Sequence, residues 1–410
     1  MKKFLILAVI AIALLQCTNN TPLPNGFELL DRDNKVGLVP PMTVEPVQTA
    51  RFWKAMPAGS QSNLLLGAGQ DAQSFIILQN NRLSQIDADD NLISAQLAFR
   101  ALSYAGETLP FELTAHVIEQ EWEESSVLWQ DVKGAFAASP VETWQVTPDD
   151  STWLYLEFSA LDFLAQWIQD SHNDQQTIQG LVLKFEQAPG GFVLASSEAT
   201  VYPPFMEIIS QDSSGGLDTT QAFLTHDASL LQNLSGEPAE TIIENPSVLK
   251  VGNATGNRSL LLFDVSEIPQ EATVHKALLT FHTEQDQIWM PDNSDAASFT
   301  VAAGIIDSTS KWQDPANIVL DSRYSRATDV ATGENDTFAF DSPGATRTMA
   351  LFVQRWVSAP SANFGILLHP FSETNDFSEM AFKSGLSDVG ALPTLEITYS
   401  LPPAHRFAQE

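Results

Sequence analysis

Short apolar runs separated by polar positions recur along most of the chain. Segments 93–99 and 274–281 alternate between apolar and polar residues, and each follows a continuous apolar run, at 75–78 or at 260–263. Alternation with a period of two is typical of a strand with one buried face, and a short continuous run is typical of a strand buried on both faces. A parallel α/β fold would need a long helix after nearly every strand, and the sequence offers none. The pattern therefore predicts an all-β, antiparallel fold.

Two segments have helical spacing instead. Residues 160–167 and 349–356 carry apolar side chains at positions i, i+3, i+4 and i+7, and each segment ends in a tryptophan, Trp167 or Trp356. This spacing places the apolar side chains on one face of an α-helix. We expect one short helix in each half of the chain, with its tryptophan buried.

The two halves are copies of one repeat. Trp122 precedes Trp167 by 45 positions, and Trp312 precedes Trp356 by 44. Many short strands with a single brief helix per copy are typical of a β-sandwich. We therefore predict two tandem antiparallel jelly-roll-like β-sandwich domains, each with one short helix.

The domain boundaries follow from the repeat. We predict the first sandwich over residues 41–210 and the second over residues 217–402. The segment 210–216 between them is rich in Gly and Ser, a composition that favours a flexible boundary.

The first 17 residues predict where the protein goes. A short positive start precedes an apolar run over 4–15, whose 12 residues are too few to span a bilayer, which takes roughly 20. Leu14-Leu15-Gln16-Cys17 resembles a bacterial lipobox, and Cys17 is the single cysteine of the chain, so no internal disulfide competes for it. We predict a lipoprotein signal peptide over 1–17 and a flexible tether over 18–40. The protein would be exported and attached through lipid on Cys17 to the bacterial cell envelope, at the outer membrane or cell surface.

The net charge of the chain excludes some classes of binding partner. Acidic residues outnumber basic ones 51 to 20, which gives a formal net charge of −31. Binding to nucleic acid depends on Lys and Arg side chains that neutralise phosphates, so a nucleic-acid partner is excluded. Docking onto anionic lipid is excluded for the same reason, which leaves the lipid anchor as the membrane contact.

Parts of the second copy resemble a known family. The segments that carry the resemblance are Arg258–Pro269, Lys276-Ala277, Asn363–Leu368 and Leu392–Tyr399. They are similar to DNRLRE-type domains and to carbohydrate-binding module family 96. The resemblance implies a jelly-roll β-sandwich of the kind found in surface lipoproteins, adhesin-like proteins and polysaccharide lyases, some of which are taken to bind alginate.

The sequence holds little catalytic chemistry. Its seven histidines lack the spacing of a zinc site, and no Gly-x-Ser-x-Gly elbow is present. Glu119, Glu121 and Glu123 would share one face of a strand, where a solvated surface explains them better than a paired-carboxylate site. We therefore predict a protein that is not an enzyme and has no cofactor. The Asp-rich loop with Asp286, Asp292, Asn293 and Asp295 leaves a structural Ca²⁺ open.

Aromatic side chains are the best candidates for binding sugar, because pyranose rings stack on indole rings. Tryptophans that recur at matching positions of both copies are better explained by packing in the core than by ligand binding. Those without a counterpart are Trp53, Trp129, Trp144, Trp153 and Trp289. From these we choose Trp289, which lies in a segment absent from the first copy, together with Trp129 and Trp144.

Three hypotheses of function remain open. The first is a surface protein that binds extracellular or cell-wall polysaccharide without catalysis. An exposed row of aromatic residues on one sheet face would support it. The alternative is a structural or adhesive protein that contacts other surface proteins, which a wide apolar patch or an unpaired edge strand would support. The third is a polysaccharide-degrading enzyme, which needs two carboxyl groups facing each other in a cleft.

Overall fold

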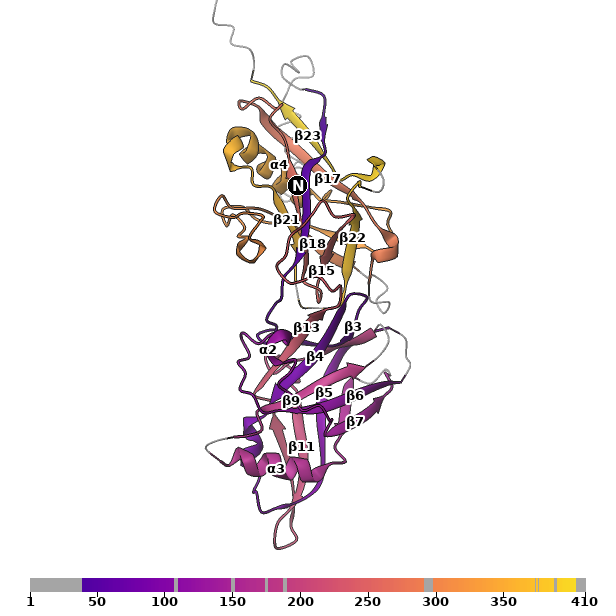
Figure 1. Cartoon of the computed structure of the whole chain (residues 1–410), viewed down its shortest axis with the longest axis vertical. Coiled ribbons are helices and arrows are strands. Elements are labelled where there is room, and N and C mark those ends of the chain that lie inside the picture. The colour runs from indigo at the N-terminus through magenta and orange to yellow at the C-terminus, as the bar shows by residue number, and fades with distance from the viewer. Residues whose placement is uncertain are drawn as a thin grey trace, which may run out of the picture.

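The described part of the protein is a pair of β-rich bodies stacked end to end (Figure 1). The computed structural model describes residues 39–402 except 107–109, 149–151, 174–175, 187–189, 291–297, 373, 375 and 387–388. The predicted signal peptide, Cys17, nearly all of the tether, and Asp292, Asn293 and Asp295 lie outside these residues. Within them, no helix is both long enough and apolar enough to cross a membrane.

The first body, the lower one in Figure 1, is one curled antiparallel sheet. Its strands run in the order β12-β11-β5-β10-β3-β4-β9-β6-β7, with β13 added beside β4 and β8 beside β5. The strand bounds are β3 (Asn63–Ala68), β4 (Ala72–Gln79), β5 (Asn91–Gly106), β6 (Phe111–Ile118), β7 (Glu142–Val146), β8 (Trp153–Glu157), β9 (Gly180–Glu186), β10 (Gly190–Ala195), β11 (Phe205–Gln211), β12 (Leu217–Phe223) and β13 (His226–Asn233). Its helices are the single turn α2 (Trp129–Val132) and α3 (Leu161–Ser171).

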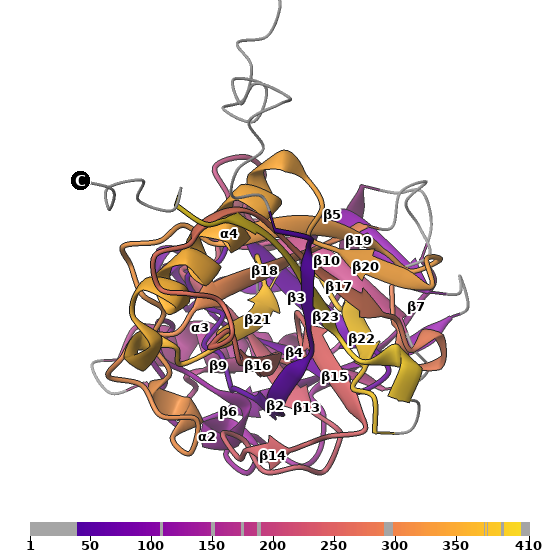
Figure 2. The ribbon, with the colours of Figure 1, turned by 90° about the horizontal axis from the view of Figure 1, so that it is seen from above.

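The second body contains three smaller antiparallel sheets. Their strand orders are β14-β2-β16-β21-β18-β19, β1-β23-β17-β20 and β15-β22. The bounds are β1 (Met42–Val44), β2 (Pro46–Trp53), β14 (Ile243–Glu244), β15 (Val248–Gly252), β16 (Asn257–Phe263), β17 (Thr273–His282), β18 (Ser298–Ile305), β19 (Ala327–Thr332), β20 (Thr337–Ala339), β21 (Ile366–Pro370), β22 (Glu379–Lys383) and β23 (Thr394–Ser400), with helix α4 (Pro343–Ser358). The two bodies overlap when viewed along the long axis (Figure 2).

The predicted fold class and both predicted helices are confirmed. Helices α3 and α4 cover the segments with helical spacing, and their tryptophans, Trp167 and Trp356, are 2% and 1% exposed. Helix α4 starts where the Ser342 side chain accepts a hydrogen bond from a backbone N–H of the first turn, followed by Pro343 at the first helical position. Both features favour a helix start.

Strand pairing crosses the predicted domain boundaries. Strands β1 and β2 lie within the predicted first domain, yet they pair with β23 and β16 of the second body. Strands β12 and β13 lie within the predicted second domain, yet they pair with β11 and β4 of the first body. Each half of the chain thus contributes two strands to the other body, so the boundaries at 41–210 and 217–402 do not divide the fold. Backbone hydrogen bonds carry no sequence information, which is why the hydrophobic pattern did not reveal this exchange.

The Gly- and Ser-rich segment is a hairpin turn and not a linker. Strands β11 and β12 pair along their whole length from Phe205–Phe223 to Gln211–Leu217, so residues 212–216 only reverse the chain. The Asp212 carboxylate accepts hydrogen bonds from the backbone N–H groups of Ser214 and Gly216, both at 2.8 Å. The same residues that make a linker flexible also make a tight turn, and the flanking strands decide between the two.

The bodies are also joined by side chains. Lys250 of the second body forms ion pairs with Asp71 of the first body and with Glu379 of its own body, the latter at 2.9 Å. Beside this network, Leu65 and Ala72 pack in one buried apolar cluster with Ala254 and Phe377. The exchanged strands and this interface together hold the two bodies as neighbours.

Candidate ligand-binding surface

Four strands of the first body lie side by side in the order β8-β5-β11-β12 and present one face away from the core. On β5, Leu97 points into the core, whereas Gln96 and Ala98 lie on the opposite face, because successive side chains of a strand alternate between its faces. Ala98 is nevertheless fully buried on that face. Residues directly opposite across paired strands share a face. The pairing therefore fixes which outward side chains form rows.

One such row is aromatic. Tyr155, Ala98, Phe205 and Phe223 follow one another directly across β8, β5, β11 and β12. The rings of Phe205 and Phe223 have centroids 5.9 Å apart. Tyr155 is 51% exposed, which leaves most of its ring open to solvent.

Trp153 widens this row at its β8 end. It lies two residues before Tyr155 on the same face, with ring centroids 6.1 Å apart and an interplanar angle of 21°. Its indole also meets Phe205 edge-on at 5.6 Å and Tyr202 edge-on at 6.0 Å. We call Trp153, Tyr155, Tyr202, Phe205 and Phe223 the aromatic face.

Tyr202 reaches the aromatic face from the turn between β10 and β11. Its φ of 61° lies in the left-handed region, which a bulky residue adopts at a cost of roughly 1–3 kcal/mol. The guanidinium of Arg100, opposite Trp153 on β5, lies 5.1 Å from the centroid of the Tyr202 ring and 5.9 Å from that of Trp153. Tyr202 remains 55% exposed. The strained backbone thus holds a ring at the surface, where core packing does not require it.

A polar row runs beside the aromatic one. Glu157, Gln96, Glu207 and Gln221 lie directly opposite one another across the same four strands. Gln96 donates to one oxygen of Glu207 at 2.8 Å, and Gln221 donates to the other at 3.2 Å. We call these four residues the polar row. Its carboxylates and amides supply both acceptors and donors next to the rings.

This arrangement suits a sugar chain. Apolar faces of pyranose rings can stack on the exposed aromatic rings while their hydroxyl groups meet the polar row. The carboxylates of Glu157 and Glu207 repel a polyanion such as alginate. The chemistry of this surface therefore favours a neutral polysaccharide.

A groove opens beside the aromatic face. It has a volume of about 610 Å³ and is lined by residues of β7 and β8, among them Glu142, Trp144 and Tyr155. Burial opposes ionisation of Glu142, but hydrogen bonds from the Ser159 hydroxyl and the Ala160 N–H outweigh burial and lower its pKa. The groove extends the surface that a ligand can contact.

None of the three tryptophans chosen from the sequence belongs to the aromatic face, although Trp144 lines the groove beside it. Trp144 is 9% exposed and packs edge-on against Phe158 in the core of the first body. Trp129 packs on Phe75, with ring centroids 4.5 Å apart. Trp289 packs beside the apolar cluster between the two bodies. The structure does not bring these three rings together in an exposed row. Among the tryptophans that are present in one copy of the repeat and not in the other, Trp153 is the one that belongs to the aromatic face.

The predicted carboxylate face does not form on a strand. Strand β6 ends at Ile118, so Glu119, Glu121 and Glu123 lie in the loop beyond it, where the alternation of a strand does not apply. All three side chains are exposed. Their spacing therefore gives no paired-carboxylate cleft.

A second cleft lies on the second body. It has a volume of about 550 Å³ and is lined by Arg258, Arg326, His369 and the exposed ring of Phe371, among others. Burial, together with the charges of Arg326 and Arg258, lowers the pKa of His369 to about 4. This cleft is basic and lacks a row of rings, so its chemistry differs from that of the aromatic face.

Comparison with known proteins adds little to this geometry. No family model matches the chain, and no curated protein matches it in sequence. Among solved structures the chain is similar to one titled "Structure of infectious bursal disease virus Gt strain", at 10% identity over 92% of this chain and 83% of that chain. The TM-score of 0.11 is too low to carry an argument about fold or function. The resemblance to DNRLRE-type domains thus stays a prediction.

Proposed function

We propose that the protein binds a neutral extracellular or cell-wall polysaccharide, without catalysis, through the aromatic face of its first body. One observation carries the proposal: five aromatic rings gather on one sheet face beside the polar row, and those of Tyr155 and Tyr202 are more than half exposed. Large aromatic side chains at a surface need a reason, because water does not favour them there. Sugar stacking supplies that reason.

The proposal includes the location predicted from the sequence. Lipid on Cys17 would anchor the chain to the bacterial cell envelope, and the segment 18–40 would act as the tether. A carbohydrate-binding body at the end of a tether can reach polymers outside the membrane.

The test is affinity electrophoresis of the full chain through gels that contain neutral polysaccharides or alginate. We expect retardation by a neutral polymer, and we expect Trp153→Ala and Tyr155→Ala each to weaken binding by about tenfold, the equivalent of about 1.4 kcal/mol. Phe371→Ala removes an exposed ring from the second body and is the matched control, because it should leave retardation unchanged.

Two results contradict the proposal. Retardation by no neutral polymer removes its substrate class. Retardation that survives in both Trp153→Ala and Tyr155→Ala but is lost in Phe371→Ala moves the site to the basic cleft of the second body.

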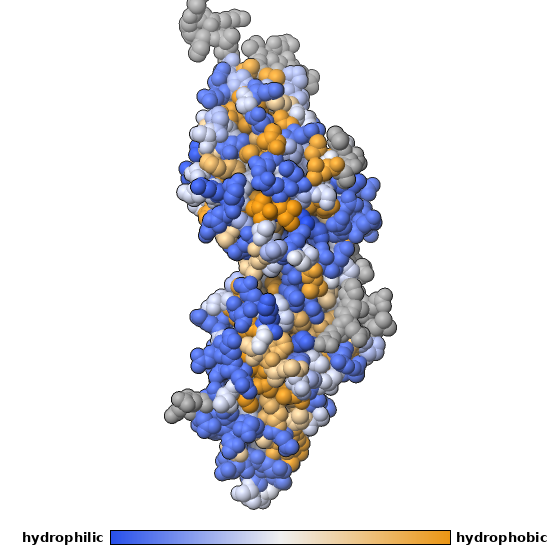
Figure 3. Space-filling model, in the orientation of Figure 1, coloured by the Kyte–Doolittle hydropathy of each residue, from blue (hydrophilic) through white to orange (hydrophobic). Residues whose placement is uncertain are grey.

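One observation favours a second candidate, a structural or adhesive role. Apolar residues gather in a band along the visible side of the first body, between hydrophilic borders (Figure 3). Such a band suits contact with another protein. Sedimentation that shows a stable self-associated or partner-bound species, in the absence of any sugar binding, would favour this role.

A further inference from the structure

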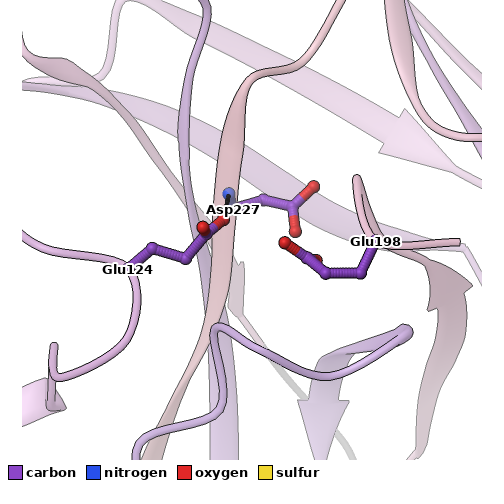
Figure 4. Close-up of side chains that lie close together, drawn as sticks. All are labelled: Glu124, Glu198 and Asp227. Carbon is purple, nitrogen blue, oxygen red and sulfur yellow. Dashed lines mark hydrogen bonds between the residues drawn. The ribbon is translucent and has the colours of Figure 1, made fainter.

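Three carboxylates from distant parts of the sequence meet in the first body (Figure 4). Glu124 lies in the loop after β6, Glu198 in the turn after β10, and Asp227 on β13. One oxygen atom of each carboxylate lies within 4.8 Å of the other two. Negative charges at this spacing repel one another unless a cation or a proton lies among them.

Asp227 is fully buried, and one of its carboxylate oxygens has no partner. Its Oδ2 accepts a hydrogen bond from the backbone N–H of Ser197 at 2.9 Å, whereas its buried Oδ1 meets no donor among the described residues. The carboxylate points toward that of Glu198 (Figure 4). An unpaired buried acceptor costs free energy, and binding of a cation or a hydrogen-bond donor would recover it.

Backbone contacts hold the carboxylates at this spacing. The Asp227 N–H donates to Oε1 of Glu124 at 2.8 Å, which ties the loop after β6 to β13. The Glu198 N–H donates to the Ser196 hydroxyl at 3.1 Å, which fixes the turn after β10. Hydrogen bonds thus hold the carboxylates of Glu124 and Asp227 in place without an ion, and the backbone of Glu198 is fixed as well.

The cluster forms no ion pair with Lys or Arg in the described part of the chain, and the basic group beside it is His226, whose charge acts on Glu124. None of the ion pairs formed there includes Glu124, Glu198 or Asp227. Burial, together with the charges of Glu198 and Glu124, raises the pKa of Asp227 to about 8. Burial also raises the pKa of Glu124.

We propose that Glu124, Glu198 and Asp227 bind one Ca²⁺ ion. Carboxylate oxygens are the donors that hard cations prefer. Three carboxylates from two loops and a strand suit Ca²⁺, which accepts flexible geometry, whereas Mg²⁺ demands near-ideal octahedral geometry and is usually bound through one or two carboxylates. Water completes the remaining coordination positions. The site is distinct from the Asp286 loop considered in the sequence, and it does not depend on sugar binding.

The bound ion would stabilise the position of strand β13 in the first body. Asp227 lies on β13, which belongs to the predicted second domain in sequence but pairs with β4 of the first body. Glu124 and Glu198 belong to the body that receives this strand. Bound Ca²⁺ therefore joins three segments of the first body across the exchange.

The test is isothermal titration of the full chain with CaCl₂ after removal of metal with EGTA. We expect one Ca²⁺ per chain, a higher Tm in Ca²⁺ than in EGTA, and weaker binding of Mg²⁺. Asp227→Asn and Glu198→Gln should each weaken Ca²⁺ binding by about tenfold or more. Glu121→Gln removes an exposed acid from the same loop as Glu124 and should leave binding unchanged.

A second readout guards against a variant that does not fold. Tb³⁺ can replace Ca²⁺ and emits when a nearby tryptophan is excited. Trp122 precedes Glu124 by two residues, and its ring meets His226, the neighbour of Asp227, at 6.4 Å. Trp122→Phe should therefore reduce Tb³⁺ emission while Ca²⁺ still competes for the site. Glu198 is exposed, so Glu198→Gln does not disturb the core.

Three results would overturn the proposal. The first is no heat of binding and no change in Tm on adding Ca²⁺ to the unmodified chain. The second is saturation that persists in both Asp227→Asn and Glu198→Gln, which places the ion elsewhere. The third is Mg²⁺ binding as tight as that of Ca²⁺, which contradicts the assignment of the metal.

Discussion

The aromatic face and its counterpart in the second body differ in their outward side chains. In the first body, Ala98 of β5 pairs with Phe205 on one side and Tyr155 on the other. In the second body, Thr280 of β17 pairs with Thr394 on one side and Ala339 on the other. The strand pairing is the same, but rings have been replaced by small side chains.

The inner sides of the two bodies remain alike. Trp122 and Trp312 both donate from Nε1 to a backbone carbonyl, that of Gln179 at 3.2 Å and that of Phe364 at 2.9 Å. In each body that carbonyl precedes a glycine with positive φ, Gly180 or Gly365. The core therefore explains why the tryptophans recur, whereas the fold does not require the rings of the aromatic face. A difference confined to the surface points to binding in the first body.

The largest loss of stability is expected from substitutions in the cores of the two bodies. Trp167→Ala and Trp356→Ala each remove a buried indole and should lower the free energy of unfolding by about 3–5 kcal/mol. Because the exchanged strands join the bodies, we expect one cooperative transition in denaturant for either variant, followed by circular dichroism and tryptophan fluorescence. Separate unfolding of one body would show that the exchange does not couple them.

The second body should be more sensitive to acid than the first. The pKa of His369 is about 4 when folded and near 6.5 when unfolded, so the unfolded state binds the proton more readily. Its contribution to stability is complete above pH 6.5 and is lost as the pH falls toward 4, by up to about 1.4 kcal/mol per pH unit. The fourth residue after the corresponding glycine in the first body is Lys184, so the first body has no histidine at this position.

Denaturant titrations between pH 7 and pH 4 test this difference. We expect His369→Gln to flatten the decline in stability over that window. An unchanged slope would assign the acid sensitivity to other groups.

The contact between the bodies should have a smaller effect. Asp71→Asn removes one of the two carboxylates that pair with Lys250, while Glu379 still neutralises its charge. Since the Asp71 carboxylate is partly exposed, we expect a loss of about 1 kcal/mol, and less at high salt. Thermal unfolding at two salt concentrations measures it. A loss as large as that of Trp356→Ala would mean that this ion pair dominates the interface.

The smallest effect on stability is expected from exchanging the outer faces. Tyr155→Ala with Phe205→Thr in the first body, and Ala339→Tyr with Thr394→Phe in the second, change partly exposed side chains and should alter the free energy of unfolding by less than about 1 kcal/mol. The first pair should abolish retardation by polysaccharide, whereas the second pair should leave it intact. If the Tyr155→Ala, Phe205→Thr variant still bound polysaccharide, the rings of the aromatic face would not be the binding site.

Part of the aromatic face was visible in the sequence. Trp153-Leu154-Tyr155-Leu156 alternates rings with leucines, which places both rings on one side of a strand and both leucines in the core. Phe205 and Phe223 gave no such signal, because their neighbours in space come from strands far apart in the chain. Trp144 also alternates with polar residues, and only the packing of β7 shows that its ring faces inward.

The carboxylates show the same limit. Glu124 stood next to the conspicuous run of acids at 119–123, but Glu198 and Asp227 gave no hint of sharing a site with it. The pattern of one strand tells which side of that strand is buried. It does not tell which loops arrive beside it.

The sequence by itself predicted the all-β class, the two helices and their buried tryptophans, and the structure confirms these features. These features can be predicted because they depend on the spacing of apolar residues within a short segment, and that spacing decides which side chains are buried. Tertiary structure alone decided that β1 and β2 join the second body while β12 and β13 join the first. The physical reason is that strands pair through backbone groups common to all residues, so several partners satisfy the same pattern, and only the packed whole selects among them.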